Sequence, residues 1–260
     1  KRFRAGASHA RVDGKVQRIE DAPQGGKYVW VEGEQHYVGV GMNVSVKAGD
    51  AVEAGDVLSD GIPNPSEIVK HKGIGEGRRY FTNAFRNAYS ESGLGAHRRN
   101  VELLTRGLIN HVRVTGEFGD HVPDDVVPYS VLEHTYKPRV GARIDTPANS
   151  GGRYLERPIL HYSIGTRIKP SVLKELQSFG INQVETHDEP PPFRSEMVRA
   201  TASISHDPDW MTRMLGSGQK KSLLGAVHTG GVSNTEGTSF VPALAAVETF
   251  GRSGLSKGWK

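Results

Sequence analysis

Closely spaced turn residues over positions 49–61 constrain the fold of this chain most strongly. Three pairs of glycine and aspartate are separated there by short apolar stretches: Gly49-Asp50, Gly55-Asp56 and Asp60-Gly61. Glycine accepts positive φ and aspartate hydrogen-bonds its own backbone, so such pairs favour tight β-turns. The segment therefore predicts short strands joined by turns.

Three β-rich runs precede these turns. Residues 28–31, 37–40 and 44–46 are β-branched or aromatic and are bounded by Gly, Gln, Asn and Asp, a composition typical of strands. Together with the turns they predict a compact all-β unit over residues 11–61, of the small barrel or sandwich kind.

Helical periodicity replaces this pattern after the last turn. A Pro-Asn-Pro connector leads into a short helix at residues 66–69, which Asn64 or Ser66 is placed to cap. A longer helix is expected from aromatic and alanine residues that recur three and four apart: Tyr80, Phe81, Ala84, Phe85, Ala88 and Tyr89. A second helix is expected from about residue 98 to 110, and alternation at residues 111–114 predicts a strand.

The second half of the chain shows weaker patterns. Residues 116–152 are rich in Gly, Pro, Asp and Asn, which predicts a long irregular arm. Beyond this arm, strands near residues 159–162 and 181–184 flank a helix that starts at Pro170 and stops at Gly180.

These patterns predict an α+β fold in four parts. The parts are a β barrel-like unit (1–61), a helical hairpin with a strand (62–115), an extended arm (116–155), and an α/β to helical C-terminal part (156–260). The last part is expected to include helices at residues 210–224 and 241–250.

The order of the first two parts, together with particular residues, resembles the C-terminal region of the β′ subunit of multisubunit RNA polymerases of cells and phages. The similar residues are Asp13 to Val16, Gly49 to Gly61, Pro65 to Ile68, Gly73, Tyr80, Tyr89, Gly93, and Val101 to Arg106 with its Glu102/Arg106 pair. The resemblance covers about residues 11–120. It implies a role for the glycine and aspartate turns and the Glu102/Arg106 pair in holding a β′-like frame.

The chain departs from that family at two places. His97-Arg98-Arg99-Asn100 stands where the family has Asn-Asp-Lys-His. The run Asn-Ala-Asp-Phe-Asp-Gly-Asp, which holds the catalytic magnesium in the family, is absent from the whole sequence. No catalytic residue is therefore expected, and the chain is not expected to polymerise RNA on its own.

A shorter similarity lies near the C-terminus. His228-Thr229-Gly230-Gly231 resembles part of the β′ trigger loop, which in the family precedes the barrel rather than following it. Two interpretations remain open, a permuted order or a coincidence of four residues, and His228 is not taken as catalytic.

Composition excludes several classes of protein. The 260 residues contain no cysteine, which excludes a disulfide framework and thiolate zinc sites. The sequence shows no apolar run long enough to span a membrane and no signal-peptide pattern. Because the first residue is Lys1 rather than Met, we expect a processed or excised piece of a longer protein, located in the cytoplasm or in a virion.

Basic residues gather in clusters although the net charge is only +4. The pairs Arg78-Arg79, Arg98-Arg99 and Lys220-Lys221 are the candidates for contact with nucleic-acid phosphates or with a neighbouring subunit. The alternative is a solvated helix end or a salt-bridged interface.

Motifs for cofactors and metals do not stand out. Gly73-Ile74-Gly75-Glu76-Gly77 opens a helix and is interpreted as a turn, while residues 216–222 lack the spacing of a phosphate-binding loop. The eleven histidines show no pair at helical spacing. No cofactor and no metal site are therefore expected.

Two functions remain open. One is a non-catalytic β′-like module of RNA polymerase, a fragment or a split subunit, with polymerase subunits and nucleic acid as partners. The other is a phage head, portal or tail protein that keeps a polymerase-like fold as a structural block. Both imply a large oligomeric assembly.

Overall fold

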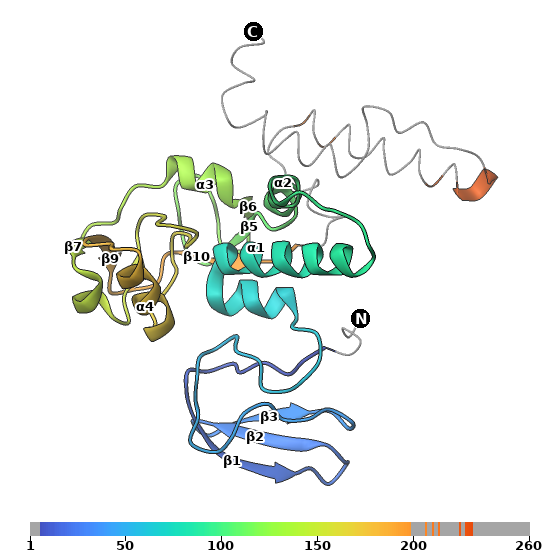
Figure 1. Ribbon diagram of the computed structural model, residues 1–260. Coiled ribbons are helices and arrows are strands. Elements are labelled where there is room, and N and C mark those ends of the chain that lie inside the picture. The colour runs from blue at the N-terminus through green and yellow to red at the C-terminus, as the bar shows by residue number, and fades with distance from the viewer. Residues whose placement is uncertain are drawn as a thin grey trace.

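A computed structural model describes residues 6–198 together with His206, Trp210, Arg213, Leu224 and residues 227–230. Lys220, Lys221, Gly231 and the helix expected at residues 241–250 lie outside the described residues. Within the described part, strands come first and helices and short strands follow (Figure 1), so the expected α+β class is confirmed.

The N-terminal strands form one antiparallel sheet in the order β3-β2-β1-β4. Its strands are β1 (Gly14–Asp21), β2 (Lys27–Val31), β3 (Glu34–Val38) and β4 (Ala51–Val52). Alternate side chains face a core of Val16, Val29, Val31, Val38 and Leu58, as expected for a sheet with one buried face. Up to Asn64 the described residues thus contain strands, bridges and turns but no helix. The strand expected at residues 44–46 is reduced to one isolated bridge, between Val44 and Ser59.

The repeated Gly-Asp pairs form two copies of one turn. Gly49 has φ +96°, and the Asp50 N–H donates to the carbonyl of Lys47 at 3.1 Å. The Asp50 carboxylate accepts the N–H of Lys47 at 2.8 Å. The same pair of bonds joins Glu53 and Asp56, at 2.9 and 2.8 Å. Positive φ at the third turn residue is a glycine conformation, so the predicted turns are confirmed.

The helical hairpin consists of α1 (Pro65–Glu91) and α2 (Arg98–Leu108), followed by β5 (His111–Val114). Asn64 caps α1, since its side-chain oxygen accepts the N–H of Ser66 at 3.1 Å. Gly73, at φ +92° and ψ 172°, breaks α1 into two helical pieces. The turn expected over residues 73–77 is therefore limited to Gly73, and the rest of that glycine pattern is helical.

The other two glycines of the pattern allow close packing. A Cβ on Gly75 would lie 1.6 Å from the carbonyl oxygen of His161, and one on Gly77 would lie 2.3 Å from the side chain of Val69. The first contact docks a distant loop on α1. The second lets the two pieces of α1 pack against each other.

Replacing Gly75 with alanine is expected to lower the free energy of unfolding by about 1–3 kcal/mol, because the backbone at His161 must move away. Gly95→Ala is the matched control, since Gly95 has no atom within 4 Å of its added Cβ. Urea unfolding followed by circular dichroism measures both. Equal stability of the two variants would contradict the close packing.

The arm expected over residues 116–152 instead contains regular structure. β6 (Val126–Pro128) pairs with β5, and α3 (Tyr129–Thr135) follows directly. We refer to residues 62–198 as the helical body. Val127, Tyr129 and Leu132 are buried in its core, beside Ile74 and Phe193. β10 (Phe193–Glu196) completes the sheet in the order β10-β5-β6. The prediction of an irregular arm was wrong, because β6 and α3 are too short to show a hydrophobic period in the sequence.

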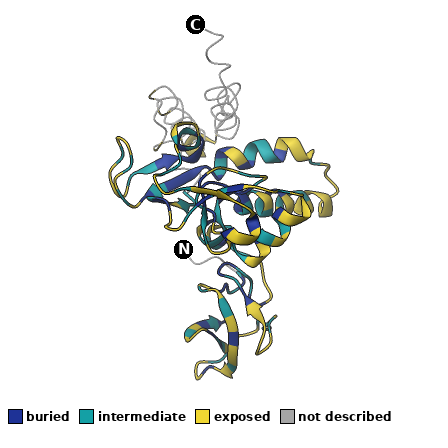
Figure 2. Ribbon diagram, turned by 90° about the vertical axis from the view of Figure 1, so that its left-hand side faces the viewer, coloured by how far each residue is buried: buried dark blue, intermediate teal, exposed yellow. Residues whose placement is uncertain are grey.

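A second small sheet has the order β7-β9-β8. Its strands are β7 (Arg143–Asp145), β8 (Tyr154–Leu155) and β9 (Val184–His187), and the 3-10 helix η1 (Pro147–Ser150) lies between the first two in sequence. α4 (Pro170–Ser178) packs on it through Val172 and Leu176. The predicted helix is confirmed, and the strand expected at 181–184 begins at Val184. Buried residues concentrate inside the helical body (Figure 2).

Candidate functional site

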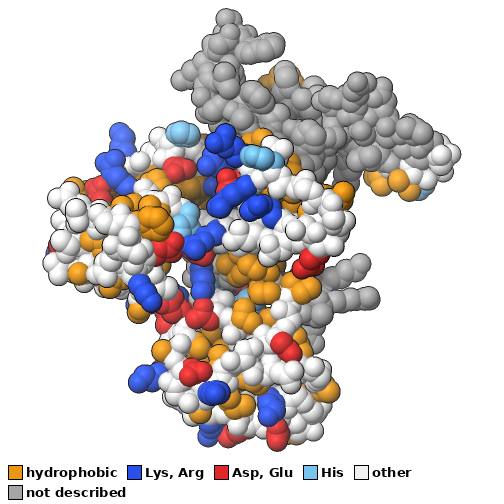
Figure 3. Space-filling model, in the orientation of Figure 1, with side chains coloured by type: hydrophobic (Ala, Val, Ile, Leu, Met, Phe, Trp, Pro, Cys, Tyr) orange, Lys and Arg blue, Asp and Glu red, His pale blue; other side chains and the backbone are white. Residues whose placement is uncertain are grey.

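A cleft of about 670 Å³ lies where the β unit meets the helical body. Its lining residues include Asp13 and Glu53 from the β unit, Lys72 and Arg79 from α1, and Lys169 before α4. Figure 3 shows acidic and basic side chains beside each other at this junction. Charged side chains therefore line the cleft on both sides.

Ion pairs connect the β unit to the body along the cleft. Lys169 Nζ lies 2.6 Å from Asp13, and Lys72 Nζ lies 2.5 Å from Asp56. His9 adds a further link, because it accepts the N–H of Asn64 at 2.9 Å while its other ring nitrogen bonds the carbonyl of Gly55 at 2.9 Å. Burial opposes ionisation of Asp13, but the bonds from Lys169 and the Ala54 N–H lower its pKa below the ordinary value.

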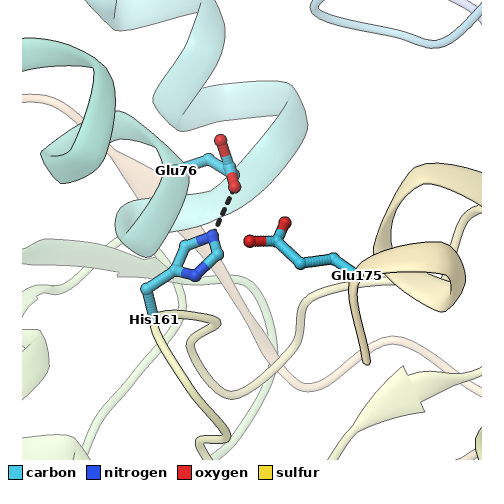
Figure 4. Close-up of side chains that lie close together, drawn as sticks. All are labelled: Glu76, His161 and Glu175. Carbon is cyan, nitrogen blue, oxygen red and sulfur yellow. Dashed lines mark hydrogen bonds and ion pairs between the residues drawn. The ribbon is translucent and has the colours of Figure 1, made fainter. Parts of the chain in front are cut away.

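Glu76 and Glu175 line this cleft, and His161 lies close to both, each coming from a different element (Figure 4). One oxygen or nitrogen from each lies within 4.8 Å of the others. The imidazole Nε2 of His161 donates to the Glu76 carboxylate. The Tyr162 hydroxyl donates to Glu175 at 2.6 Å. Two carboxylates and one imidazole therefore face a common point.

Arg79 supplies the positive charge at that point. Its Nη1 lies 2.9 and 3.2 Å from the two Glu175 oxygens, 3.4 Å from Glu76 and 3.3 Å from Nε2 of His161. The Arg79 side chain is 46% exposed, whereas those of Glu76 and Glu175 are 25% and 24% exposed. The acids are thus held inside the cleft and the cation reaches them from solvent.

Local structure positions His161. Leu160 and His161 form a two-residue turn closed by hydrogen bonds between Ile159 and Tyr162, at 3.1 and 2.9 Å. Leu160 has φ +54°, a conformation that costs energy for a branched residue. The His161 carbonyl rests against Gly75 on α1. The imidazole is therefore presented to α1 and α4 by a constrained turn.

The charges of the cluster follow from its contacts. Burial opposes ionisation of Glu76, but the His161 hydrogen bond and the charges of Arg79 and Lys72 lower its pKa below the ordinary value. Burial and the bond to Glu175 raise the pKa of Tyr162, so its hydroxyl stays a donor. The cluster can hold a cation between its two carboxylates.

Sequence reasoning missed this cluster. Glu76 and His161 are 85 residues apart, so no spacing rule relates them. The glycine at position 75 was the available signal, since it allows the close approach of the His161 loop.

Of the predicted contact residues on α1, Arg78 points into the protein, whereas the Arg79 side chain is 46% exposed. Arg78 donates to the carbonyl of Ile109 at 2.7 Å and to the side chain of Asn110 at 3.0 Å. Its guanidinium lies 5.9 Å from the ring centre of Tyr129. Arg78 therefore joins α1 to the α2–β5 junction, and Arg79 belongs to the acidic cluster.

Arg98 and Arg99 are exposed at the start of α2. Arg98 lies 2.6 Å from Glu102. Glu102 therefore pairs with Arg98, whereas the sequence had suggested a pair with Arg106. Arg99 and Arg106 face solvent. Contact of these residues with nucleic acid stays a prediction.

Asp60 and Gly61, the last pair of the glycine and aspartate turns, make local contacts within the fold. Asp60 accepts the backbone and side-chain N–H groups of Asn43 at 2.8 and 3.0 Å, and Gly61 has φ +111°. His228 is helical and exposed.

Among the described residues, no helix combines the length and apolar character needed to cross a bilayer.

Comparison with known proteins points to one subunit, although no protein-family model matches the chain. The β′ subunit of DNA-directed RNA polymerase from Endomicrobium trichonymphae is 30% identical over 118 residues, 43% of this chain and 7% of the relative. The subunit from Desulforudis audaxviator is 30% identical over 148 residues, 54% of this chain and 12% of the relative. That from Saccharophagus degradans is 31% identical over 136 residues, 50% of this chain and 9% of the relative.

The chain spans 7% to 12% of the length of these relatives. About half of this chain is therefore similar to a short region of the β′ subunit of DNA-directed RNA polymerase.

Proposed function

We propose that this chain is a non-catalytic β′-like module of RNA polymerase, a fragment or split subunit that acts in subunit assembly. The similarity of about half the chain to β′ subunits carries this proposal. The missing Asn-Ala-Asp-Phe-Asp-Gly-Asp run supports the non-catalytic part, because that run supplies the magnesium ligands in the resembled family.

The contacts of the β′-like residues support a bracing role. The Gly-Asp turns place Asp56 against Lys72 of α1, and His9 joins the same turn to the start of α1. The β unit and the hairpin are thus held in a fixed relation, as a module that braces other subunits requires. The division at residue 61 is part of this proposal.

Exposed arginines on α2 support contact with nucleic acid as a further part of the role. Arg98, Arg99 and Arg106 are exposed on α2, and α2 carries Glu102 as its acidic residue. Arginine binds phosphate well because of its planar fork of donors. A cytoplasmic location accords with this role.

Purification of the native complex that contains this chain tests the proposal. Mass spectrometry is expected to find other β- or β′-like chains, including one that carries the aspartate run. The native mass is expected to equal that of a multisubunit polymerase. Co-purification with capsid, portal or tail proteins in a symmetric copy number would contradict the proposal and favour a structural role in a virion.

A further inference from the structure

The cluster of Glu76, His161 and Glu175 has no part in the bracing role, yet its chemistry is specific. We propose that these three side chains bind a divalent transition-metal ion of the Zn²⁺ class, in exchange for the Arg79 guanidinium. This inference goes beyond the β′-like function and does not depend on it.

The donor set fits such an ion. Imidazole nitrogen and carboxylate oxygen are ordinary zinc ligands, and three protein ligands leave a position for water. The three donor atoms lie within 4.8 Å of one another, so side-chain rotations bring them around one ion. The Nε2 proton that His161 donates to Glu76 moves to Nδ1 or to solvent when the ion binds, since a ligand nitrogen must be unprotonated. Each comes from a separate element, α1, the 160–161 turn or α4.

Arg79 shows where the site stabilises positive charge. A single nitrogen, Nη1, is within 3.4 Å of both carboxylates and of the imidazole. It therefore stands in for a cation at the point where the three donors converge. Because its side chain is 46% exposed, Arg79 can turn into solvent without burying an unpaired charge.

The ligands have supporting contacts. Tyr162 donates to Glu175 at 2.6 Å, which orients this carboxylate in the way that outer hydrogen bonds orient metal ligands. The constrained turn at Leu160 and the contact with Gly75 fix His161. Preorganised donors lower the cost of assembling the site around an ion.

Isothermal titration with ZnCl₂ tests the proposal on the full chain. The wild type is expected to bind one ion saturably. Glu175→Gln, which keeps the side-chain shape and an acceptor for Tyr162, is expected to weaken the affinity by about 10- to 100-fold or more. Arg79→Met is expected to tighten it by about tenfold, because a competing charged hydrogen-bond partner is removed.

Two controls separate this site from adventitious binding. His134→Ala removes an exposed histidine on α3 and should leave the titration unchanged. Visible absorption of bound Co²⁺ should appear with the wild type and disappear with His161→Ala, while circular dichroism confirms that the variants are folded. Failure of the wild type to bind Zn²⁺ one to one, or equal binding by folded Glu175→Gln, would overturn the proposal.

Discussion

Glu156→Ala is expected to lower the free energy of unfolding by about 3–5 kcal/mol, the cost of leaving one member of a buried ion pair without its partner. The Glu156 side chain has 0% exposure and pairs with Arg139 at 2.7 Å. It also accepts the Tyr136 hydroxyl at 2.8 Å and the backbone N–H of Arg139 at 2.9 Å. Removal of the carboxylate takes the acceptor away from the Tyr136 hydroxyl and the Arg139 backbone N–H, and takes the counter-charge away from the Arg139 guanidinium.

The same carboxylate joins three segments. Arg139 donates to the carbonyls of Glu189 and Pro190, at 2.6 and 2.8 Å, so Glu156 holds the end of α3 against the loop before β10. Urea unfolding measures the loss. Glu102→Ala is the control, because Glu102 forms an exposed pair with Arg98 and its removal should cost at most about 1 kcal/mol. Similar losses in both variants would contradict a special role for Glu156.

The loss of stability at acidic pH should also report the interaction of Glu156 with Arg139 and Tyr136. Burial opposes ionisation of Glu156, but the bonds from Arg139 and Tyr136 lower its pKa below the ordinary value. A lowered folded-state pKa adds stability above the unfolded-state pKa of about 4.3, and that stability is lost as the pH falls through the folded-state pKa. Glu156→Gln should therefore show a smaller loss of stability below about pH 5 than the wild type.

Arg78→Ala is expected to lower the free energy of unfolding by about 1.5–3 kcal/mol, the range for hydrogen bonds made by charged groups. Its bonds to Ile109 and Asn110 hold α1 to the α2–β5 junction. Arg99→Ala on the exposed side of α2 should change stability by about 0.5 kcal/mol or less.

DNA binding is expected to depend on Arg99 rather than on Arg78, the reverse of what is expected for stability. If Arg99 contacts phosphate, Arg99→Ala should reduce the slope of log affinity against log salt by about 0.9 on duplex DNA. Arg78→Ala should leave that slope unchanged. A reduced slope with unchanged stability in Arg78→Ala would restore Arg78 as a nucleic-acid contact and contradict its structural role.

Elements set by local rules were predicted well from the sequence. The Gly-Asp turns, the cap at Asn64 and the helix ending at Gly180 depend on φ preferences and hydrogen bonds within a few residues. Long amphipathic helices also repeat their pattern often enough to be recognised. The short β6 and α3 do not, which explains why residues 116–152 were wrongly expected to be irregular.

The sequence by itself determined the β-rich unit, the helical hairpin and the resemblance to β′, because these depend on short-range pattern and residue order. The tertiary structure alone decided which charges meet. Arg79 and Glu175 are 96 residues apart, and only the docking of the His161 loop and α4 on α1 brings them together. The inward direction of Arg78 is likewise a product of packing, since adjacent arginines on a helix point to different sides and the sequence does not say which side is covered.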